Sequence, residues 1–331
     1  MNIKKIGVLT SGGDAPGMNA AIRAVVRTAI FNNIETVGIM RGYNGLINGD
    51  IKNLTLRDVS DIIHRGGTTL FTARCLEFKT EEGLNKVVKN CKDYNIDALV
   101  VIGGDGTFRG ARDLSARGIT CVGIPATIDN DIGCSDYTIG FDTALNTAME
   151  MIDKLRDTAQ SHDRCTVVEV MGRRAGYIAL ETGIACGATF IIVPEIPDID
   201  IDNNIIKKIK EIQKTGKKHF IIVVGEGYKK TNELAEYVQA QTNLETRVAV
   251  LGHVQRGGSP SVKDRVTATH MGNYAVNLLI NKTSQVNQTQ NKSYVVIVKN
   301  GEVTSIPIED AFNKQKEFDY NLYNIASQVS L

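Results

Sequence analysis

Short, continuous apolar runs alternate with amphipathic segments along almost the whole chain, and this alternation constrains the fold more than any other feature. Strands are predicted at residues 6–9, 37–40, 98–102, 121–124, 166–170, 190–193, 220–224 and 248–251. Helices are predicted at about 18–31, 81–94, 107–117, 141–160 and 263–280, and a polar surface loop at 283–292. Apolar strands followed by helices are typical of parallel sheets covered on both faces. We therefore expect a doubly wound α/β fold of two similar three-layer α/β/α lobes.

The composition excludes several classes of protein. With 331 residues, of which 42% are hydrophobic and 23% charged, the chain can bury cores that a disordered or fibrous protein lacks. The 38 Lys and Arg against 37 Asp and Glu leave a net charge of +1, so no overall field attracts nucleic acid or an anionic membrane. No apolar run approaches the ~18 residues of a membrane helix, and the amino terminus has no secretion-signal pattern. The six scattered cysteines form no CxxC pair, so we expect reduced thiols and a cytoplasmic protein.

Two glycine-rich loops, Thr10–Gly17 and Gly103–Gly106, each follow a predicted strand and precede a helix. In open α/β sheets ligands bind beyond the carboxyl ends of the strands. Glycine lets the backbone approach a phosphate, and a helix start offers free N–H groups. The first loop is not a P-loop, because Met18 stands where Lys is required, and the second has one residue too many for a dinucleotide fingerprint. One such loop is equally consistent with a tight turn, but two, each containing an Asp, favour a phosphate ligand.

Asp105 lies between two glycines, where its carboxylate can point into the cleft. A magnesium ion held jointly by a carboxylate and nucleotide phosphates is consistent with that position. The alternative is an Asp that caps its own turn.

A third loop, Pro125–Asp131, follows the strand that ends at Ile124. In an extended stretch Thr127, Asp129 and Asp131 project to the same side. Two neighbouring carboxylates repel, so one of them can serve as a base. An Asx-rich turn is the alternative, but the place of the loop beside two glycine loops favours a site.

Basic residues gather in the later loops, where Arg173, Arg247 and His253 with Arg256 are expected at or beside the carboxyl ends of strands. Arg is a forked donor suited to phosphate, although single surface arginines are more often solvated or ion-paired. Two anion sites with magnesium and a base between them describe a phosphoryl-transfer enzyme.

The order of these runs resembles that of the bacterial ATP-dependent 6-phosphofructokinases. The match covers nearly the whole chain, and the runs that carry it are Leu9–Asn19, Gly103–Gly106, Thr127–Asp131, Met171–Arg173 and Gly252–Gly258. The resemblance implies that the γ-phosphoryl group of ATP is transferred to the 1-hydroxyl of fructose 6-phosphate, the committed step of glycolysis. The GGDGT run alone also occurs in NAD and lipid kinases, but such a kinase leaves the third and last runs unexplained. A non-catalytic nucleotide sensor is a further alternative.

The resemblance also implies roles for individual residues. Asp129 would be the base, Thr127 would orient the transferred group, Arg173 would stabilise transition-state charge, and Asp105 would hold Mg²⁺. The ATP site would comprise Gly13, Tyr43, Arg74, Cys75, Gly104, Asp105, Gly106, Thr107 and Gly110. The fructose 6-phosphate site would comprise Thr127, Ile128, Asp129, Arg164, Met171, Gly172, Arg173, Glu226, Arg247, His253, Val254, Gln255 and Arg256.

In this family Arg164 and Arg247 reach the site of a neighbouring subunit, which implies a homotetramer. The family resemblance also implies interleaved lobes with the active site in the cleft between them. Residues 1–139 and 254–303 would bind ATP, and residues 140–253 and 304–331 would bind fructose 6-phosphate.

Departures from the family pattern bear on the donor and on regulation. Pyrophosphate-dependent relatives usually carry Asp at the position of Gly106 and Lys at that of Ala126, so ATP is the expected donor and pyrophosphate the alternative. Tyr177 stands where an Asp is usual. A basic lining for an ADP or phosphoenolpyruvate effector is expected at Arg23, Arg27, Arg156, Gly187, Lys217, Lys218 and His219. Thr189, Thr215 and Leu56 replace a usual Glu, Lys and Arg there, so the resemblance implies weakened or lost activation by ADP.

Overall fold

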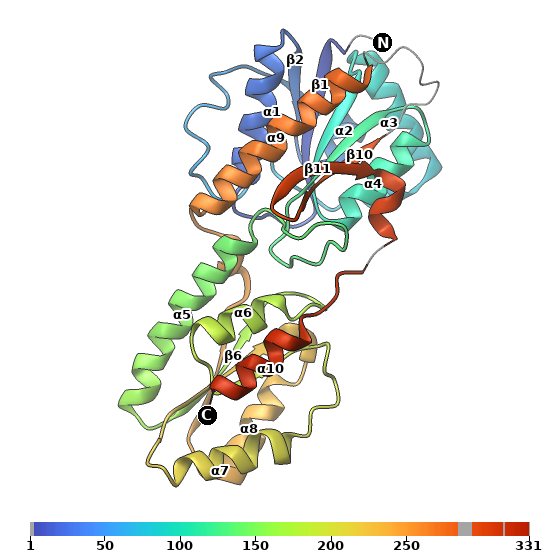
Figure 1. The fold of residues 1–331 in the computed structure, drawn as a ribbon. Coiled ribbons are helices and arrows are strands. Elements are labelled where there is room, and N and C mark those ends of the chain that lie inside the picture. Colours follow the sequence, from blue (N-terminus) through green and yellow to red (C-terminus); the bar gives the residue numbers. More distant parts are fainter. Residues whose placement is uncertain (1–2, 284–292, 314, 331) are drawn as a thin grey trace. The chain divides into compact units, whose positions relative to one another are not determined.

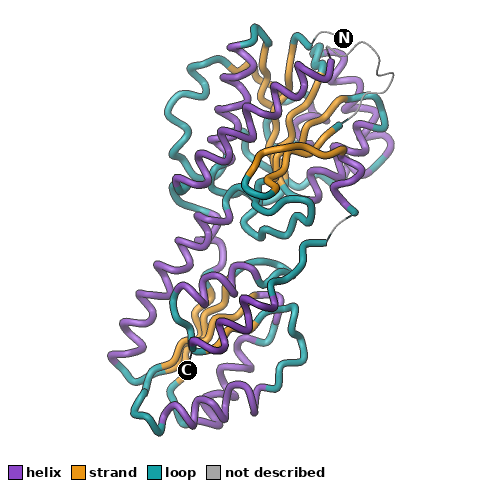
Figure 2. Tube along the Cα trace, viewed as in Figure 1, coloured by secondary structure: helices purple, strands orange, loops and turns teal. Residues whose placement is uncertain are grey.

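Two sheets organise the chain, one in each of the two units into which the computed structural model divides. The structure describes residues 3–283, 293–313 and 315–330. Unit 1 comprises Met1–Ile128, Ile132–Thr143 and Arg256–Lys316, and unit 2 comprises Asp129–Asp131, Ala144–Gln255 and Glu317–Leu331. In each unit the strands form a central layer with helices beside it (Figure 2).

The sheet of unit 1 has the strand order β11-β10-β5-β4-β1-β2-β3. Its strands are β1 (Lys5–Ser11), β2 (Glu35–Ile39), β3 (Ile51–Leu54), β4 (Ala98–Gly103), β5 (Thr120–Pro125), β10 (Tyr294–Lys299) and β11 (Glu302–Pro307). The outer pairs β2–β3 and β10–β11 are antiparallel, and the inner pairs are parallel. Ser11 pairs with Gly103, and Gly103 pairs with Pro125. The first glycine loop, the second glycine loop and the third loop therefore begin side by side, at the carboxyl ends of adjacent strands.

Helices cover both faces of this sheet. Figure 1 shows α1 (Met18–Phe31) and α9 (Val262–Thr283) side by side on one face, where they pack against each other. The other face is covered by α2 (Tyr43–Asn48), α3 (Glu81–Asp93) and α4 (Asp105–Ser115), with the short helices η1 (Glu77–Lys79) and η5 (Ile308–Phe312). Helix α3 begins where it does because the Thr80 hydroxyl accepts a hydrogen bond from the Gly83 amide at 3.1 Å. The core of this layer includes the fully buried Phe108 and Leu114 of α4.

The sheet of unit 2 is entirely parallel and has the order β7-β8-β6-β9. Its strands are β6 (Cys165–Val170), β7 (Phe190–Ile192), β8 (Phe220–Gly225) and β9 (Thr246–Val250). One face packs on η2 (Asp202–Ile206, a π-helical turn), α7 (Lys207–Gln213) and α8 (Thr231–Thr242). Helix α6 (Tyr177–Ala185) contacts Ile191, whose side chain points away from that face, so α6 lies on the other face. The remaining helices are α5 (Phe141–Ser161), which begins in unit 1 and continues into unit 2, η3 (Glu226–Tyr228), η4 (Gly252–Arg256) and α10 (Tyr320–Val329).

The predicted strands and helices are confirmed, with ends shifted by up to two or three residues. Three strands were missed: β3, β10 and β11. Of the predicted polar loop, residues 284–292 lie outside the described residues. The expected lobe boundary at 303/304 falls inside β11, which belongs to unit 1 because it pairs with β10 along its whole length. The nucleotide and sugar-phosphate roles of the two lobes stay predictions.

Within the part of the chain that the structure describes, no helix is both long enough and apolar enough to cross a membrane.

Candidate active site

The first glycine loop is held from three sides within unit 1. The Thr72 hydroxyl donates a hydrogen bond to the Gly12 carbonyl at 2.7 Å, and the Thr107 hydroxyl donates to the Ser11 carbonyl at 3.0 Å. The Arg256 guanidinium donates to the Asp14 carbonyl at 3.2 Å. It also lies so close to Gly13 that a Cβ there would be 1.9 Å from Nη1, so any side chain at Gly13 would displace Arg256. Gly13 and Arg256, which the sequence assigned to different substrates, are therefore direct neighbours.

The second glycine loop leads straight into α4. Gly104 directly precedes the helix and Asp105 is its first residue. Asp105 has 49% of its side chain exposed, and its nearest cation is Arg109 at 3.8 Å. A Cβ on Gly106 would meet no atom within 4 Å, so the helix start is open on that side. Free N–H groups at an open helix start can bind an anion such as phosphate.

A magnesium ion is compatible with this position if phosphate oxygens complete its coordination. Asp105 offers an exposed carboxylate, which is the ligand type that magnesium prefers. No group of three or more His, Cys, Asp or Glu side chains among the described residues could hold a metal ion. The chain alone therefore offers too few ligands, whereas one carboxylate with substrate phosphates is a common arrangement for magnesium.

Tyr43 lies beneath α4 and is not exposed. Its ring stacks on Phe78 at 4.0 Å, and its hydroxyl donates to the Thr107 carbonyl at 2.6 Å. Burial raises the pKa of Tyr43 well above its usual value. A Cβ on Gly110 would lie 2.7 Å from the Tyr43 ring, so glycine is needed where α4 crosses this pair. The structure thus makes Tyr43 and Gly110 supports of the loop, while Arg74 is exposed and Cys75 is half-buried against the same core.

The third loop is folded back rather than extended. The Ala126 amide donates to the Gly103 carbonyl at 3.0 Å, and the Thr138 hydroxyl donates to the Thr127 carbonyl at 2.6 Å. The chain then turns at Ile128 and Asp129, and Asn130 has a φ of +50°. The expected alternation of an extended strand is therefore wrong. Asp129 is almost completely buried, whereas Asp131 is half-buried.

Unit 2 brings Asp129 near Arg173. Arg173 Nε lies 4.0 Å from Asp129 Oδ2, with 68% of the arginine side chain exposed and 3% of the aspartate. Arg173 has a φ of +57°, which is rare for a residue with a side chain, and Gly172 before it has a φ of +139°. Glu226 Oε1 accepts the Arg173 amide at 2.6 Å and the Gly172 amide at 3.2 Å. The carboxylate of Glu226 thus holds the strained turn that aims Arg173.

The loop 252–256 is joined to the same turn through Gln255. Gln255 is fully buried, and its Oε1 accepts the Met171 amide at 2.9 Å. His253 and Val254, the two residues before Gln255, are exposed. Met171, Gly172, Arg173, Glu226 and Gln255 therefore form one connected group at the carboxyl end of β6.

Arg164 and Arg247 lie at the other end of these strands, the amino end. Arg164 directly precedes β6, and Arg247 is the second residue of β9, paired with Thr166. The expectation that Arg247 lies at a carboxyl end is wrong, because Arg247 comes before the apolar residues of its strand and therefore lies near the amino end of β9. The length of β6, roughly 20 Å at about 3.3 Å per residue, separates these arginines from Arg173. Both bind Glu245, with Arg164 Nε 2.8 Å from Oε2 and Arg247 Nε 2.9 Å from Oε1, and these hydrogen bonds lower the pKa of Glu245.

The expected effector residues are divided between the units. Arg23 and Arg27 lie on α1, whereas Arg156, Lys217 and His219 form a cationic cluster in unit 2. Burial and the neighbouring Arg156 lower the pKa of Lys217, and burial followed by Lys217 and Arg156 lowers that of His219. Arg156 also donates to the Cys186 carbonyl beside Gly187, and Lys218 pairs with Asp163 at 3.4 Å.

A separate cavity of about 440 Å³ in unit 2 is lined by Thr189, by residues around η2 and by α10. None of the residues expected to bind ATP or fructose 6-phosphate lines it.

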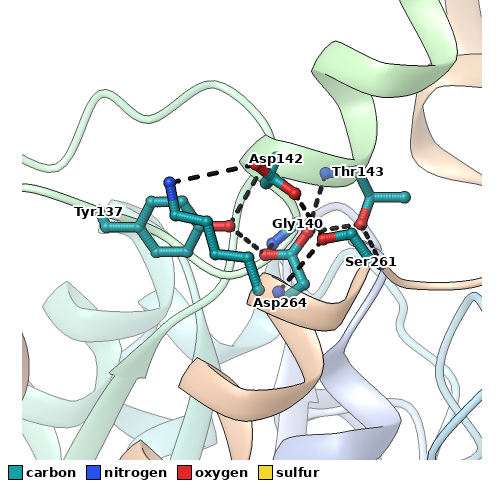
Figure 3. Close-up of polar contacts among 7 residues, drawn as sticks. Tyr137, Gly140, Asp142, Thr143, Ser261 and Asp264 are labelled. Carbon is teal, nitrogen blue, oxygen red and sulfur yellow. Dashed lines mark hydrogen bonds and ion pairs between the residues drawn. The ribbon is translucent and has the colours of Figure 1, made fainter.

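One buried polar cluster in unit 1 was missed altogether. It joins Tyr137, Gly140 and Thr143 to Asp264 at the start of α9 (Figure 3). The spacing Ser261-x-x-Asp264 before a helix, which is typical of a capping box, was the available signal.

Comparison with known proteins gives a consistent picture. The family model described as phosphofructokinase matches residues 5–279. A protein of Bacillus pumilus named ATP-dependent 6-phosphofructokinase is 53% identical over 329 residues, which is 99% of this chain and 100% of the relative. A protein of Clostridium botulinum with the same name is 52% identical over 328 residues, again 99% of this chain and 100% of the relative.

Solved structures agree on the fold. The structure of phosphofructokinase from Saccharomyces cerevisiae matches with a TM-score of 0.88 and 33% identity, covering 98% of this chain and 46% of that longer one. A pyrophosphate-dependent phosphofructokinase from Marinobacter aquaeolei matches with a TM-score of 0.82, 21% identity and coverage of 96% and 86%; at that identity the likeness concerns the fold alone.

Proposed function

This chain belongs to the phosphofructokinase family, and on that premise we propose that it transfers the γ-phosphoryl group of ATP to the 1-hydroxyl of fructose 6-phosphate. The products are ADP and fructose 1,6-bisphosphate, and the reaction is the committed step of glycolysis. The observation that carries the proposal is the 53% identity, over 99% of the chain, to a relative named ATP-dependent 6-phosphofructokinase.

We assign the nucleotide to the open start of α4 and the first glycine loop. The unobstructed backbone at Gly106 supports this assignment, since phosphate oxygens can approach the amides there. Asp105 would hold Mg²⁺, which when bound supplies positive charge to the phosphate oxygens. Thr107 joins the two loops, because its hydroxyl donates a hydrogen bond from α4 to the Ser11 carbonyl.

We assign the proton transfer to Asp129, which would accept the proton of the attacking sugar hydroxyl. Its shielding from water supports this role, since a base that is not solvated retains its attraction for a substrate proton. Arg173 would place its forked donor on the oxygens that gain charge, and Thr127 would orient the transferred group. Met171, Glu226, His253 and Arg256 would bind the sugar phosphate, with Glu226 acting partly through the turn that it holds.

The donor is ATP rather than pyrophosphate in this proposal. An aspartate at position 106 would introduce a second carboxylate beside Asp105, exactly where the present glycine leaves room for a nucleotide. Ala126 is buried and uncharged, so it offers no cation to a pyrophosphate.

Arg164 and Arg247 are proposed to serve a neighbouring subunit of a homotetramer in the cytoplasm. Their position, at the far edge of the sheet from Arg173, supports a role away from the site of their own chain. Effector binding at the cluster of Arg156, Lys217 and His219 is proposed to be weak for ADP, since Thr189 offers no carboxylate for an effector-bound magnesium.

The first test is a coupled assay of the purified protein with fructose 6-phosphate and Mg²⁺, comparing ATP with pyrophosphate. Turnover with ATP alone supports the proposal, and turnover with pyrophosphate would overturn the assignment of the donor. Binding of ATP without turnover would favour a nucleotide sensor, and phosphorylation of NAD or of a lipid instead would favour a kinase of another class.

The second test asks whether Asp129 is the base. Asp129→Ser should lower kcat by about 10²–10⁴-fold with little change in substrate affinity. Asp131→Asn is the matched control, because it changes the other carboxylate of the loop and should retain most activity. The reverse order of effects would assign the proton transfer to Asp131.

A further inference from the structure

Asp264 is a fully buried carboxylate on the third residue of α9. Its Oδ1 accepts the Tyr137 hydroxyl at 2.5 Å and the Gly140 amide at 2.7 Å. Its Oδ2 accepts the Thr143 amide at 2.9 Å and the Thr143 hydroxyl as well. Burial raises the pKa of Asp264, and the hydrogen bonds from Thr143, Tyr137 and Gly140 oppose that rise. Four donors directed at two oxygens are best satisfied by the ionised carboxylate.

These bonds attach the start of α5 to the start of α9. Gly140 directly precedes α5 and has no side chain with which to cap it, so Asp264 caps the amides of Gly140 and Thr143 from another helix. Ser261, which directly precedes α9, accepts the Asp264 amide at 3.2 Å and donates to Asp142 at 2.6 Å. Figure 3 shows the Asp264 carboxylate between Tyr137 and Thr143, with Ser261 beside it.

The capped segment lies directly against two of the loops assigned to the reaction. The Ile139 amide donates to the Pro125 carbonyl at 3.0 Å, and the Thr138 hydroxyl donates to the Thr127 carbonyl at 2.6 Å. A Cβ on Gly140, whose φ is +103°, would lie 2.7 Å from the Ala15 Cβ. A Cβ on Gly17 would lie 2.6 Å from Ile139 and 3.5 Å from the Asp264 Cβ. Residues 138–140 are thus closely packed against both the first glycine loop and the third loop.

We propose that Asp264 is a positioning residue for phosphoryl transfer: it fixes residues 137–143, and these fix the Thr127 carbonyl and the first glycine loop. The proposal rests on the proposed function, because Thr127 lies two residues before Asp129, the proposed base. Asp264 touches neither substrate in this scheme. Its loss lowers turnover because the phosphate-binding loop and the segment that leads to the base are both held less firmly.

The test uses an isosteric change first. Asp264→Asn replaces an acceptor oxygen with an amide NH2 group, a donor that faces the Gly140 or Thr143 amide. We expect kcat to fall by about 10²-fold, with the Kd for ATP changed much less. Thr143→Val removes only the hydroxyl, with an expected loss of about tenfold, and Thr143→Ser restores that hydroxyl and should restore kcat. If Asp264→Asn does not fold, the Thr143 pair decides the question.

Asp136→Asn is the matched control. Asp136 accepts the Lys299 amine at 2.7 Å and the Asn300 amide at 2.8 Å, so it anchors the same segment to the β10–β11 turn instead. This variant should lose thermal stability without losing kcat at 25 °C. Equal kcat losses in the Asp136 and Asp264 variants would overturn the proposal in favour of general destabilisation.

Hydrogen exchange of the ligand-free protein provides a readout that does not depend on the reaction. Asp264→Asn should speed exchange of the Ala126 and Ile139 amides by more than tenfold, in addition to those of residues 140–143. Faster exchange confined to residues 140–143, or unchanged kcat in Thr143→Val, would overturn the proposal. A wild-type protein that exchanges as expected but does not phosphorylate fructose 6-phosphate would instead refute the proposed function.

Discussion

The two units hold their candidate residues by different means. In unit 1 the groups offered to a ligand are backbone amides, and the surrounding side chains of Thr72, Thr107 and Arg256 bind backbone carbonyls to keep those loops in place. In unit 2 the groups offered are charged side chains, and the carboxylate of Glu226 binds backbone amides to aim Arg173. The first arrangement depends on the absence of side chains at particular glycines, and the second depends on single polar atoms. Substitutions should therefore act through packing in unit 1 and through lost hydrogen bonds in unit 2.

The comparison of the two units is tested first at the Glu226 carboxylate. Glu226→Ala removes the acceptor for the Gly172 and Arg173 amides and should lower kcat/KM for fructose 6-phosphate by about 10²-fold, leaving KM for ATP nearly unchanged. Glu226→Gln keeps an acceptor oxygen and should retain most activity. Steady-state kinetics of both variants checks this, and an equal loss in the two would mean that the charge itself binds the sugar phosphate.

The next prediction distinguishes the roles of residues at the two ends of the strands of unit 2, Arg164 at the amino end and Asp129 near Arg173 at the carboxyl end. Arg164→Ala and Asp129→Ser should each be severely impaired in fructose 6-phosphate turnover. If Arg164 serves a neighbouring subunit, mixed oligomers refolded from the two inactive variants should regain activity, because some sites combine an intact Arg164 with an intact Asp129. The assay compares the mixture with each variant refolded alone. Mixed oligomers that stay inactive would assign Arg164 to its own chain.

Two glycines on α4 test whether substitutions in unit 1 act through packing. Gly110→Ala places a methyl group 2.7 Å from the Tyr43 ring and should destabilise the fold by about 1–3 kcal/mol. Gly106→Ala meets no atom and should stabilise the helix by up to ~1 kcal/mol while weakening ATP binding. Urea unfolding and nucleotide titration measure the two effects. Destabilisation by Gly106→Ala would show that the backbone conformation at position 106 requires glycine, even though there is room for a side chain.

The smallest expected effect is a pH dependence at His219. Its pKa is lowered by burial and by the nearby Lys217 and Arg156, so protonation costs more in the folded than in the unfolded state. Stability should therefore decline slightly as the pH falls through 6.5, the ordinary pKa of the group, toward the folded value, and should be unaffected above it. An NMR titration of His219 checks the direction, and Lys217→Met should move the pKa back up. A His219 pKa above 6.5 would show that Lys217 and Arg156 do not lower it.

The sequence predicted most strands whose burial is continuous along the chain, and it predicted poorly at the edges of the sheets. The exception is β10, an inner strand that was missed although Tyr294–Ile297 are buried. Strand β4 and the glycine loop after it were predicted because five consecutive apolar residues can be buried on both faces. Strands β3 and β11 were missed because their residues are partly exposed and gain their hydrogen bonds from one antiparallel neighbour. Arg247 was misplaced for a different reason: it comes before the apolar residues 248–251 and therefore lies near the amino end of β9.

By itself the sequence determined the class of fold, the three loops at the carboxyl edge of the first sheet and the family to which the chain belongs. These follow from local periodicity and from residue types at fixed spacing, which depend on burial and backbone conformation near each position. Only the tertiary structure decided that Glu226 aims Arg173, that Arg164 and Arg247 share Glu245, and that Asp264 caps a helix that begins 123 residues earlier. A carboxylate can bind any suitably placed donor, and which donor lies within reach is settled by the packing of elements far apart in the chain.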